Sequence, residues 1–139
     1  MNFEITISYY DVDPNSFNGK IKKFVHVIAC CGENYTHAES IATKWANENI
    51  DVDYSIRPIK EIDISGVYEE DLGPYFLCQG EWSEMSDRTG KVKIYKMNFL
   101  VRTKNSTEAS KIAFKEMNEI HYDSRIVNVK ETKIEHYIP

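Results

Sequence analysis

The chain of 139 residues contains an internal repeat, which restricts its fold more than any motif does. The segments IRPIKEIDI (56–64) and IVNVKETKI (126–134) share the pattern I-x-x-[IV]-K-E-x-x-I, one in each half of the chain. At nearly the same separation along the chain, GKIKKF (19–24) aligns with GKVKIY (90–95), and THAESIATK (36–44) aligns with TEASKIAFK (107–115). These matches follow one another in the same order, which predicts two copies of one unit rather than two similar but unrelated βαβ segments.

The first copy is predicted to form two strands, a helix and a third strand. Apolar and polar residues alternate at 3–12, which predicts a strand, and the β-branched and aromatic residues at 20–31 predict a second strand. The two strands are expected to form a hairpin. Thr36, with Glu39 three residues later, predicts a capping box at the start of a helix that runs to Asn49. The third strand is expected at 54–64, where Pro58 is typical of a sheet edge. The apolar stripe of the helix consists of Ala38, Ile41, Ala42 and Trp45.

The second copy repeats this order after a short linker at 65–74. Strands are expected at 75–84, 91–102 and 124–138, with a helix at 105–120. The predicted apolar stripe of this helix is Ala109, Ile112, Ala113, Met117 and Ile120.

The predicted fold is therefore α+β, an internally duplicated ββαβ-ββαβ chain. We expect six strands, two helices packed on one face, and a pseudo-twofold relation between the copies. A chain of this length fits a single domain at 1–139, made of a first copy at 3–66 and a second copy at 74–137.

Charge, hydropathy and cysteine content limit the kinds of partner and the cellular location that we expect. The net charge of −5 lowers the expectation of nucleic-acid binding without excluding a local basic groove. The longest uncharged apolar run, VIACC at 27–31, is too short to span a membrane. Three cysteines cannot all pair within one chain, so we expect reduced thiols and a cytoplasmic protein. The apolar outer face of the strand at 25–29 allows packing between the halves, or a homo-oligomer.

Several segments together resemble a known family. They are FVHVIA, YTHAES, WSE, NFLVRT and VKETKI, in this order along residues 20–136. The chain resembles a domain-of-unknown-function family of small proteins from gut bacteria and their phages, although His37 and Ser40 depart from its helix-start pattern. The resemblance implies a small intracellular accessory protein, acting in the host cytoplasm if phage-encoded, with no established catalytic residues to carry over.

No motif for catalysis, metal binding or a cofactor is present. The four histidines lack metal-site spacing, and His26 and Cys30, on one strand face, lie too far apart to share a zinc ion. The cysteines fall in apolar strands, which favours inert thiols over a nucleophile. We therefore predict no catalytic residues, no metal and no cofactor.

A ligand-binding surface is predicted at the two hairpins. Lys20 and Lys22 align with Lys91 and Lys93. Aromatic residues lie nearby in the sequence, namely Tyr9, Tyr10, Phe24, Trp82 and Tyr95, of which Tyr10, Trp82 and Tyr95 are predicted to bind the ligand. Basic groups beside stacking rings suit a nucleotide or a short nucleic acid. The alternative is that the lysines protect strand edges and the rings fill ordinary sheet positions.

The leading functional hypothesis is a non-enzymatic binding protein. It would sequester a nucleotide-type ligand or block a host protein, as a phage accessory or anti-defence protein does. One alternative is a small nucleotide-processing enzyme with a dispersed site, which requires perturbed titratable groups in one cleft. Another is a single-stranded nucleic-acid binder, whose affinity would fall steeply with salt.

Overall fold

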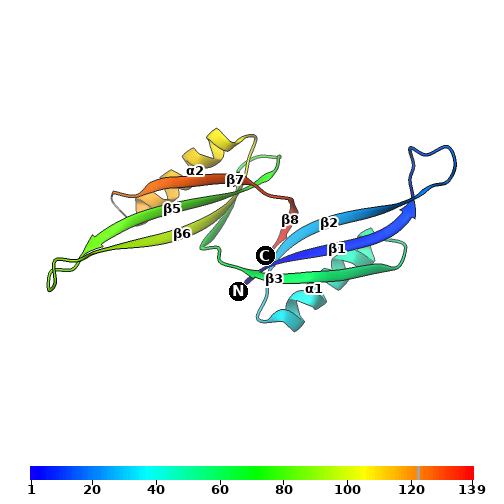
Figure 1. The fold of residues 1–139 in the computed structure, drawn as a ribbon, viewed down its shortest axis with the longest axis horizontal. Helices are drawn as coiled ribbons and strands as arrows, with labels where there is room; N and C mark the ends of the chain where they lie inside the picture. Colours follow the sequence, from blue (N-terminus) through cyan, green and yellow to red (C-terminus); the bar gives the residue numbers. More distant parts are fainter. Residues whose placement is uncertain (122) are drawn as a thin grey trace. The chain divides into compact units, whose positions relative to one another are not determined.

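The computed structural model describes residues 1–121 and 123–139, and this part of the chain is α+β. It contains two helices and eight strands in two four-stranded sheets (Figure 1). The chain divides into two compact units. Unit 1 consists of Met1–Asp63 and Ile134–Pro139, and unit 2 consists of Ile64–Lys133.

Unit 1 is a four-stranded sheet with one helix on one of its faces (Figure 1). The strand order is β3-β1-β2-β8, in which β1 is antiparallel to both β2 and β3, and β8 runs parallel to β2. The elements are β1 (Asn2–Val12), β2 (Ile21–Cys31), α1 (Tyr35–Asn49), β3 (Tyr54–Ile62) and β8 (Ile134–Ile138).

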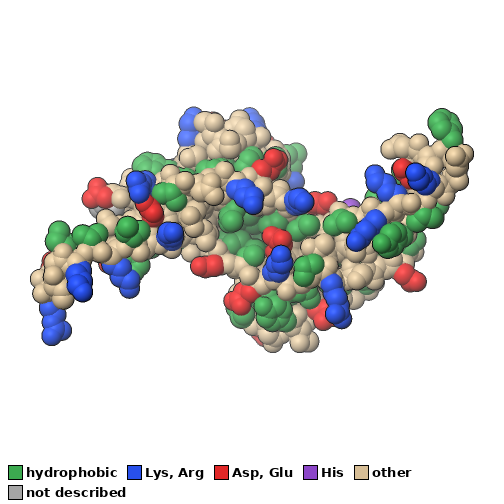
Figure 2. All heavy atoms as spheres, viewed as in Figure 1, with side chains coloured by type: hydrophobic (Ala, Val, Ile, Leu, Met, Phe, Trp, Pro, Cys, Tyr) green, Lys and Arg blue, Asp and Glu red, His purple; other side chains and the backbone are tan. Residues whose placement is uncertain are grey.

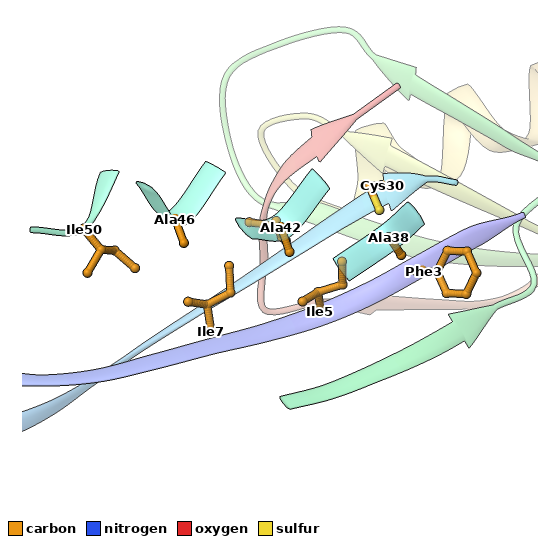
Figure 3. Packing of buried hydrophobic residues seen from close by; sticks show 9 residues of the cluster. Phe3, Ile5, Ile7, Cys30, Ala38, Ala42, Ala46 and Ile50 are labelled. Carbon is orange, nitrogen blue, oxygen red and sulfur yellow. The ribbon is translucent and has the colours of Figure 1, made fainter. Parts of the chain in front are cut away.

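Strand alternation builds the core of unit 1. Every second residue of β1 faces α1, so Phe3, Ile5 and Ile7 are fully buried. The helix meets them with alanines four residues apart, whose short side chains let its backbone lie close to the sheet (Figure 3). The core is completed by Ile28, Cys30, Ala38, Ala42, Ala46 and Ile50.

Unit 2 has the same plan, with strand order β4-β6-β5-β7 and one helix on the sheet. Here β5 is antiparallel to β6 and β7, and β4 runs parallel to β6. The core consists of Phe76, Cys78, Phe99, Val101, Ala109, Ala113 and Met117. The elements are β4 (Gly66–Glu69), β5 (Tyr75–Met85), β6 (Val92–Arg102), α2 (Ser106–Ile120) and β7 (Arg125–Glu131).

The prediction of six strands was wrong, because each half ends in one strand more than predicted. The single strand expected at 124–138 is two strands, β7 and β8, separated by Thr132 and Lys133. The expected linker at 65–74 contains β4. Each extra strand pairs with the sheet of the other half of the sequence: β4 adds to β6 in unit 2, and β8 adds to β2 in unit 1.

The two exchanged strands have equivalent registers. His136 pairs with Ile28, and Gly66 pairs with Phe99. Ile28 and Phe99 occupy matching positions of the sequence repeat, and so do Gly66 and His136. The two halves of the sequence therefore exchange strands reciprocally: β4, which begins at the expected end of the first copy and lies in the linker, joins unit 2, and β8, at the end of the second copy, joins unit 1.

Two details of the helices differ from the prediction. The N-cap of α1 is Asn34, whose side chain accepts the His37 N–H at 2.8 Å, so the capping box at Thr36 was wrong by two residues. The N-cap of α2 is Asn105, which accepts the Glu108 N–H at 2.9 Å. Ile120, predicted to be buried, is 53% exposed because α2 ends there, beyond the last core contact of Met117.

The edge position of Pro58 was predicted correctly, since β3 ends its sheet. No helix in the described residues is long and apolar enough to cross a membrane. The three cysteines form no disulfide; Cys30 and Cys78 are buried and Cys31 is exposed.

Candidate ligand-binding site

The first candidate site lies on the β1–β2 hairpin, on the sheet face that carries α1. Tyr9 and Phe24 are paired across the strands, and their rings stack with centroids 5.2 Å apart and planes 14° apart. Lys22 comes from the same face of β2, and its Nζ lies over the Phe24 ring at 5.5 Å from the centroid. We call Tyr9, Lys22 and Phe24 the first platform.

The second candidate site lies at the matching place on the β5–β6 hairpin. Trp82 and Tyr95 are paired across the strands, and their rings also stack with centroids 5.2 Å apart and planes 14° apart. Lys93 Nζ lies over the Tyr95 ring at 5.0 Å from the centroid. Trp82, Lys93 and Tyr95 form the second platform, which has the same geometry as the first although both rings differ in kind.

A carboxylate stands opposite the lysine in both platforms. Asp11 is the cross-strand partner of Lys22, and Glu84 is the partner of Lys93. Such opposite-charge pairs are common between neighbouring strands and stabilise them modestly. Each lysine is exposed, so a ligand can reach its ammonium group from solvent.

Each platform also contacts a histidine, but from a different element. In unit 1, His26 on β2 stacks on Tyr9 at 5.7 Å between centroids, and its Nδ1 lies 2.8 Å from Glu135 Oε2 on β8. In unit 2, His121 at the end of α2 stacks on Trp82 at 3.9 Å. An imidazole therefore accompanies the rings in both units without occupying equivalent sequence positions.

The structure also locates the other predicted site residues. Lys20 and Lys91 lie at the hairpin ends, where their carbonyl oxygens accept the N–H groups of Asp13 and Ser86 at 2.8 and 2.9 Å. Tyr10 is 64% exposed and projects from the opposite sheet face, so it does not join the first platform.

Both hairpins carry basic side chains (Figure 2). Residues 10–25 carry three lysines against two aspartates, and residues 83–96 carry four basic residues against two acidic ones. Both segments are thus positive within a chain of net charge −5. Figure 2 also shows apolar side chains among the basic ones; those most exposed include Phe17 at the turn of the first hairpin.

The second platform has an unsatisfied hydrogen-bond donor. Trp82 Nε1 is buried and has no partner among the described residues, which is uncommon for a buried polar atom. A small cavity of about 150 Å³ borders the indole. On its rim, Arg125 Nε donates to Glu81 Oε1 at 2.6 Å.

Shifted pKa values occur elsewhere in the molecule. Burial raises the pKa of Cys78 to about 11 and also raises the pKa of Cys30, which the neighbouring Cys31 increases further. Burial likewise raises the pKa of Tyr68 and Tyr137. None of these four groups belongs to a platform. In the described part of the chain, no three metal-ligating side chains gather in one place.

Sequence reasoning named Tyr9 and Phe24 among the aromatic residues near the lysines but predicted Tyr10 in their place as the ligand-binding residue, and it did not include the two histidines. Strand alternation could have selected Tyr9 over Tyr10, because Phe3, Ile5 and Ile7 fix which face of β1 is buried. His121 had no comparable signal, since its contact with Trp82 depends on how α2 ends against the sheet.

A protein-family model described as "Domain of unknown function (DUF4494)" matches residues 1–139. The comparison with curated proteins found no significant match. The comparison with solved structures also found none.

Proposed function

The chain belongs to the DUF4494 family of unknown function, and we propose from its two platforms that it is a non-enzymatic binding protein for a nucleotide-type ligand. The observation that carries the proposal is the recurrence of one lysine–ring–ring arrangement with the same stacking geometry in both units. The stacked rings are Tyr and Phe in the first platform and Trp and Tyr in the second, but both platforms place a flat ring beside an ammonium group.

This chemistry fits both parts of a nucleotide. A base can stack on the paired rings, and its phosphate can accept charge-assisted hydrogen bonds from the lysine. The ligand then replaces the cation–π contact of Lys22 or Lys93 with an ion pair, which keeps the ammonium group partnered.

The two platforms arose, on this proposal, by duplication of one unit. Matching strand registers, matching asparagine caps and the sequence repeat support a duplicated scaffold that carries one platform per copy. A protein that binds without turnover acts by occupancy, for example by sequestering its ligand. A phage accessory or anti-defence role, and an intracellular location, rest on the sequence resemblance alone.

A second candidate function is binding of single-stranded nucleic acid. The observation that favours it is the positive charge of both hairpin ends within an acidic chain. A strand that follows a hairpin could use the platform for a base and the remaining lysines for successive phosphates.

Calorimetric titration of the full chain with adenosine 5′-monophosphate, and with an eight-nucleotide single-stranded DNA, tests both candidates. Lys22→Gln and Lys93→Gln are each expected to weaken their own platform about tenfold, a loss of about 1.4 kcal/mol of binding free energy. Lys23→Gln and Lys96→Gln are matched controls, since these exposed lysines project from the opposite sheet face.

The outcomes separate the candidates. Binding of the mononucleotide supports a nucleotide-type ligand, whereas binding of the oligonucleotide alone, with steep salt dependence, supports the second candidate. Equal losses in the platform and control variants would show that binding is only electrostatic attraction to the hairpins. Turnover of either probe that one platform substitution abolishes would replace the binding proposal with an enzyme.

A further inference from the structure

Unit 1 contains a cavity of about 480 Å³ between α1 and the end of β8. This volume is within the range of small-molecule sites in proteins. Its apolar wall consists of Ile41 and Trp45 from the helix and Ile138 from the strand. The Trp45 ring also contacts His26 and His136, which do not line the cavity and whose ring centroids lie 5.7 and 5.9 Å away. The wall is thus a flat ring with an aliphatic side chain from each element.

Two hydrogen-bond donors line the same cavity. The Nδ1 atom of His37 accepts the Glu33 N–H at 3.0 Å, so the neutral imidazole carries its proton on Nε2. Lys44 supplies an ammonium group and forms no ion pair with any of the residues that the structure describes. Among the described residues that line the cavity, which also include Pro139, only Glu48, one helical turn beyond Lys44, has a carboxylate side chain.

The equivalent surface of unit 2 has different chemistry. At the repeat spacing, His37 and Trp45 correspond to Glu108 and Glu116, although Lys44 corresponds to Lys115. The core alanines facing the sheet are nevertheless kept, as Ala109 and Ala113 show. The halves therefore agree where the fold requires it and differ where the cavity lies.

We propose that this cavity binds a small molecule with a flat apolar ring and a single acidic group, at a site separate from both platforms. The ring packs on Trp45 between the two isoleucines, and the acidic group accepts hydrogen bonds from Lys44 Nζ and His37 Nε2–H. Glu48 repels a second acidic group, which excludes ligands with several phosphates. The proposal does not depend on the function assigned to the platforms.

Cys31 provides a direct readout of occupancy. Its exposed thiol lines the cavity, whereas Cys30 and Cys78 are buried and burial raises the pKa of both, which lowers their reactivity. A thiol reagent at neutral pH should therefore modify Cys31 first, and a ligand in the cavity should slow that reaction.

The experiment uses the full chain with two probes of the required chemistry, 1-anilinonaphthalene-8-sulfonate and indole-3-acetate. Binding is followed by probe fluorescence or calorimetry, and occupancy by the rate at which Ellman's reagent modifies Cys31. We expect saturable binding of one probe molecule per chain and a reduction in the Cys31 rate of about fivefold or more. Lys44→Gln should weaken binding about tenfold, and Lys115→Gln, the matched position of unit 2, should leave it unchanged.

Three results would overturn the proposal: no binding of either probe, binding that leaves the Cys31 rate unchanged, or equal losses in the Lys44 and Lys115 variants. Lys44 and Lys115 are both exposed, so neither substitution should disturb folding. Loss of nucleotide binding in the Lys22 and Lys93 variants has no effect on this test, because those residues do not line the cavity.

Discussion

At the scale of single residues, the two cores fill the same space in opposite ways: one has its large side chain on the strand and the other has it on the helix. In unit 1 the positions are Ile7 on β1 and Ala46 on α1. The equivalent positions of unit 2 are Gly80 on β5 and Met117 on α2, where a Cβ on Gly80 would overlap the methionine sulfur. A large residue on one element therefore requires a small one on the other, because the interior is closely packed.

This relation predicts strong coupling in a double-mutant cycle. Gly80→Ile should destabilise the protein by about 3 kcal/mol or more through overpacking, and Met117→Ala by about 2–5 kcal/mol through a cavity. The double variant restores the arrangement of Ile7 and Ala46, so it should be more stable than the sum of the single losses implies. Urea unfolding measures this, and additive losses would show that the two positions do not share one space.

At the scale of elements, both helices begin with an asparagine cap. Asn34 and Asn105 have extended backbones and accept N–H groups three residues later. Replacing either with alanine leaves that N–H without its side-chain partner, so each variant should lose about 1 kcal/mol of unfolding free energy. Asn→Asp at the same positions keeps the acceptor and should retain most of the stability. Thermal unfolding monitored by circular dichroism distinguishes the two, and equal losses would indicate that the side-chain acceptor is not what stabilises the helix start.

The exchanged strands allow a reciprocal prediction. Tyr137 on β8 pairs with β2, and Val67 on β4 pairs with β6. Proline at Tyr137 should weaken amide protection in β2 of unit 1, while proline at Val67 should weaken it in β6 of unit 2. Hydrogen exchange followed by mass spectrometry compares the two variants, each the control for the other. Loss of protection within the same sequence half, in β5 for Tyr137→Pro or β1 for Val67→Pro, would contradict the exchange.

At the scale of the whole molecule, the sequence predicted the repeated order of hairpin, helix and strand, but not the exchange. Alternation and helical periodicity are local, and they place Phe3 or Ala42 in a core without reference to distant strands. Thr132 and Lys133 carry no turn signal, because no Gly, Pro, Asn or Asp stands between Val129 and Ile134, although the apolar alternation stops over these four polar residues. The pairing of β8 with β2 joins segments from opposite halves of the sequence, and no local pattern specifies such a partner.

For the candidate sites too, local sequence patterns predict some residues and not others. The lysines of both platforms could be predicted because they fall within the repeat, and their rings lie two positions away on the same strand face. The contact of His121 with Trp82, and the cavity beside Trp45, depend on tertiary packing of helix against sheet. Those features could not be read from spacing alone.

The central claim is that each unit carries one independent nucleotide-binding platform, and the number of bound ligands tests it most directly. Titration calorimetry with adenosine 5′-monophosphate should give two sites per chain. Lys22→Gln or Lys93→Gln should leave one site at its original affinity and weaken the other about tenfold, and the variant with both substitutions should have two sites that are each weakened about tenfold. The Lys23→Gln, Lys96→Gln double variant should keep two. A single site in the unaltered chain, or two undiminished sites in the Lys22→Gln, Lys93→Gln variant, would contradict the account.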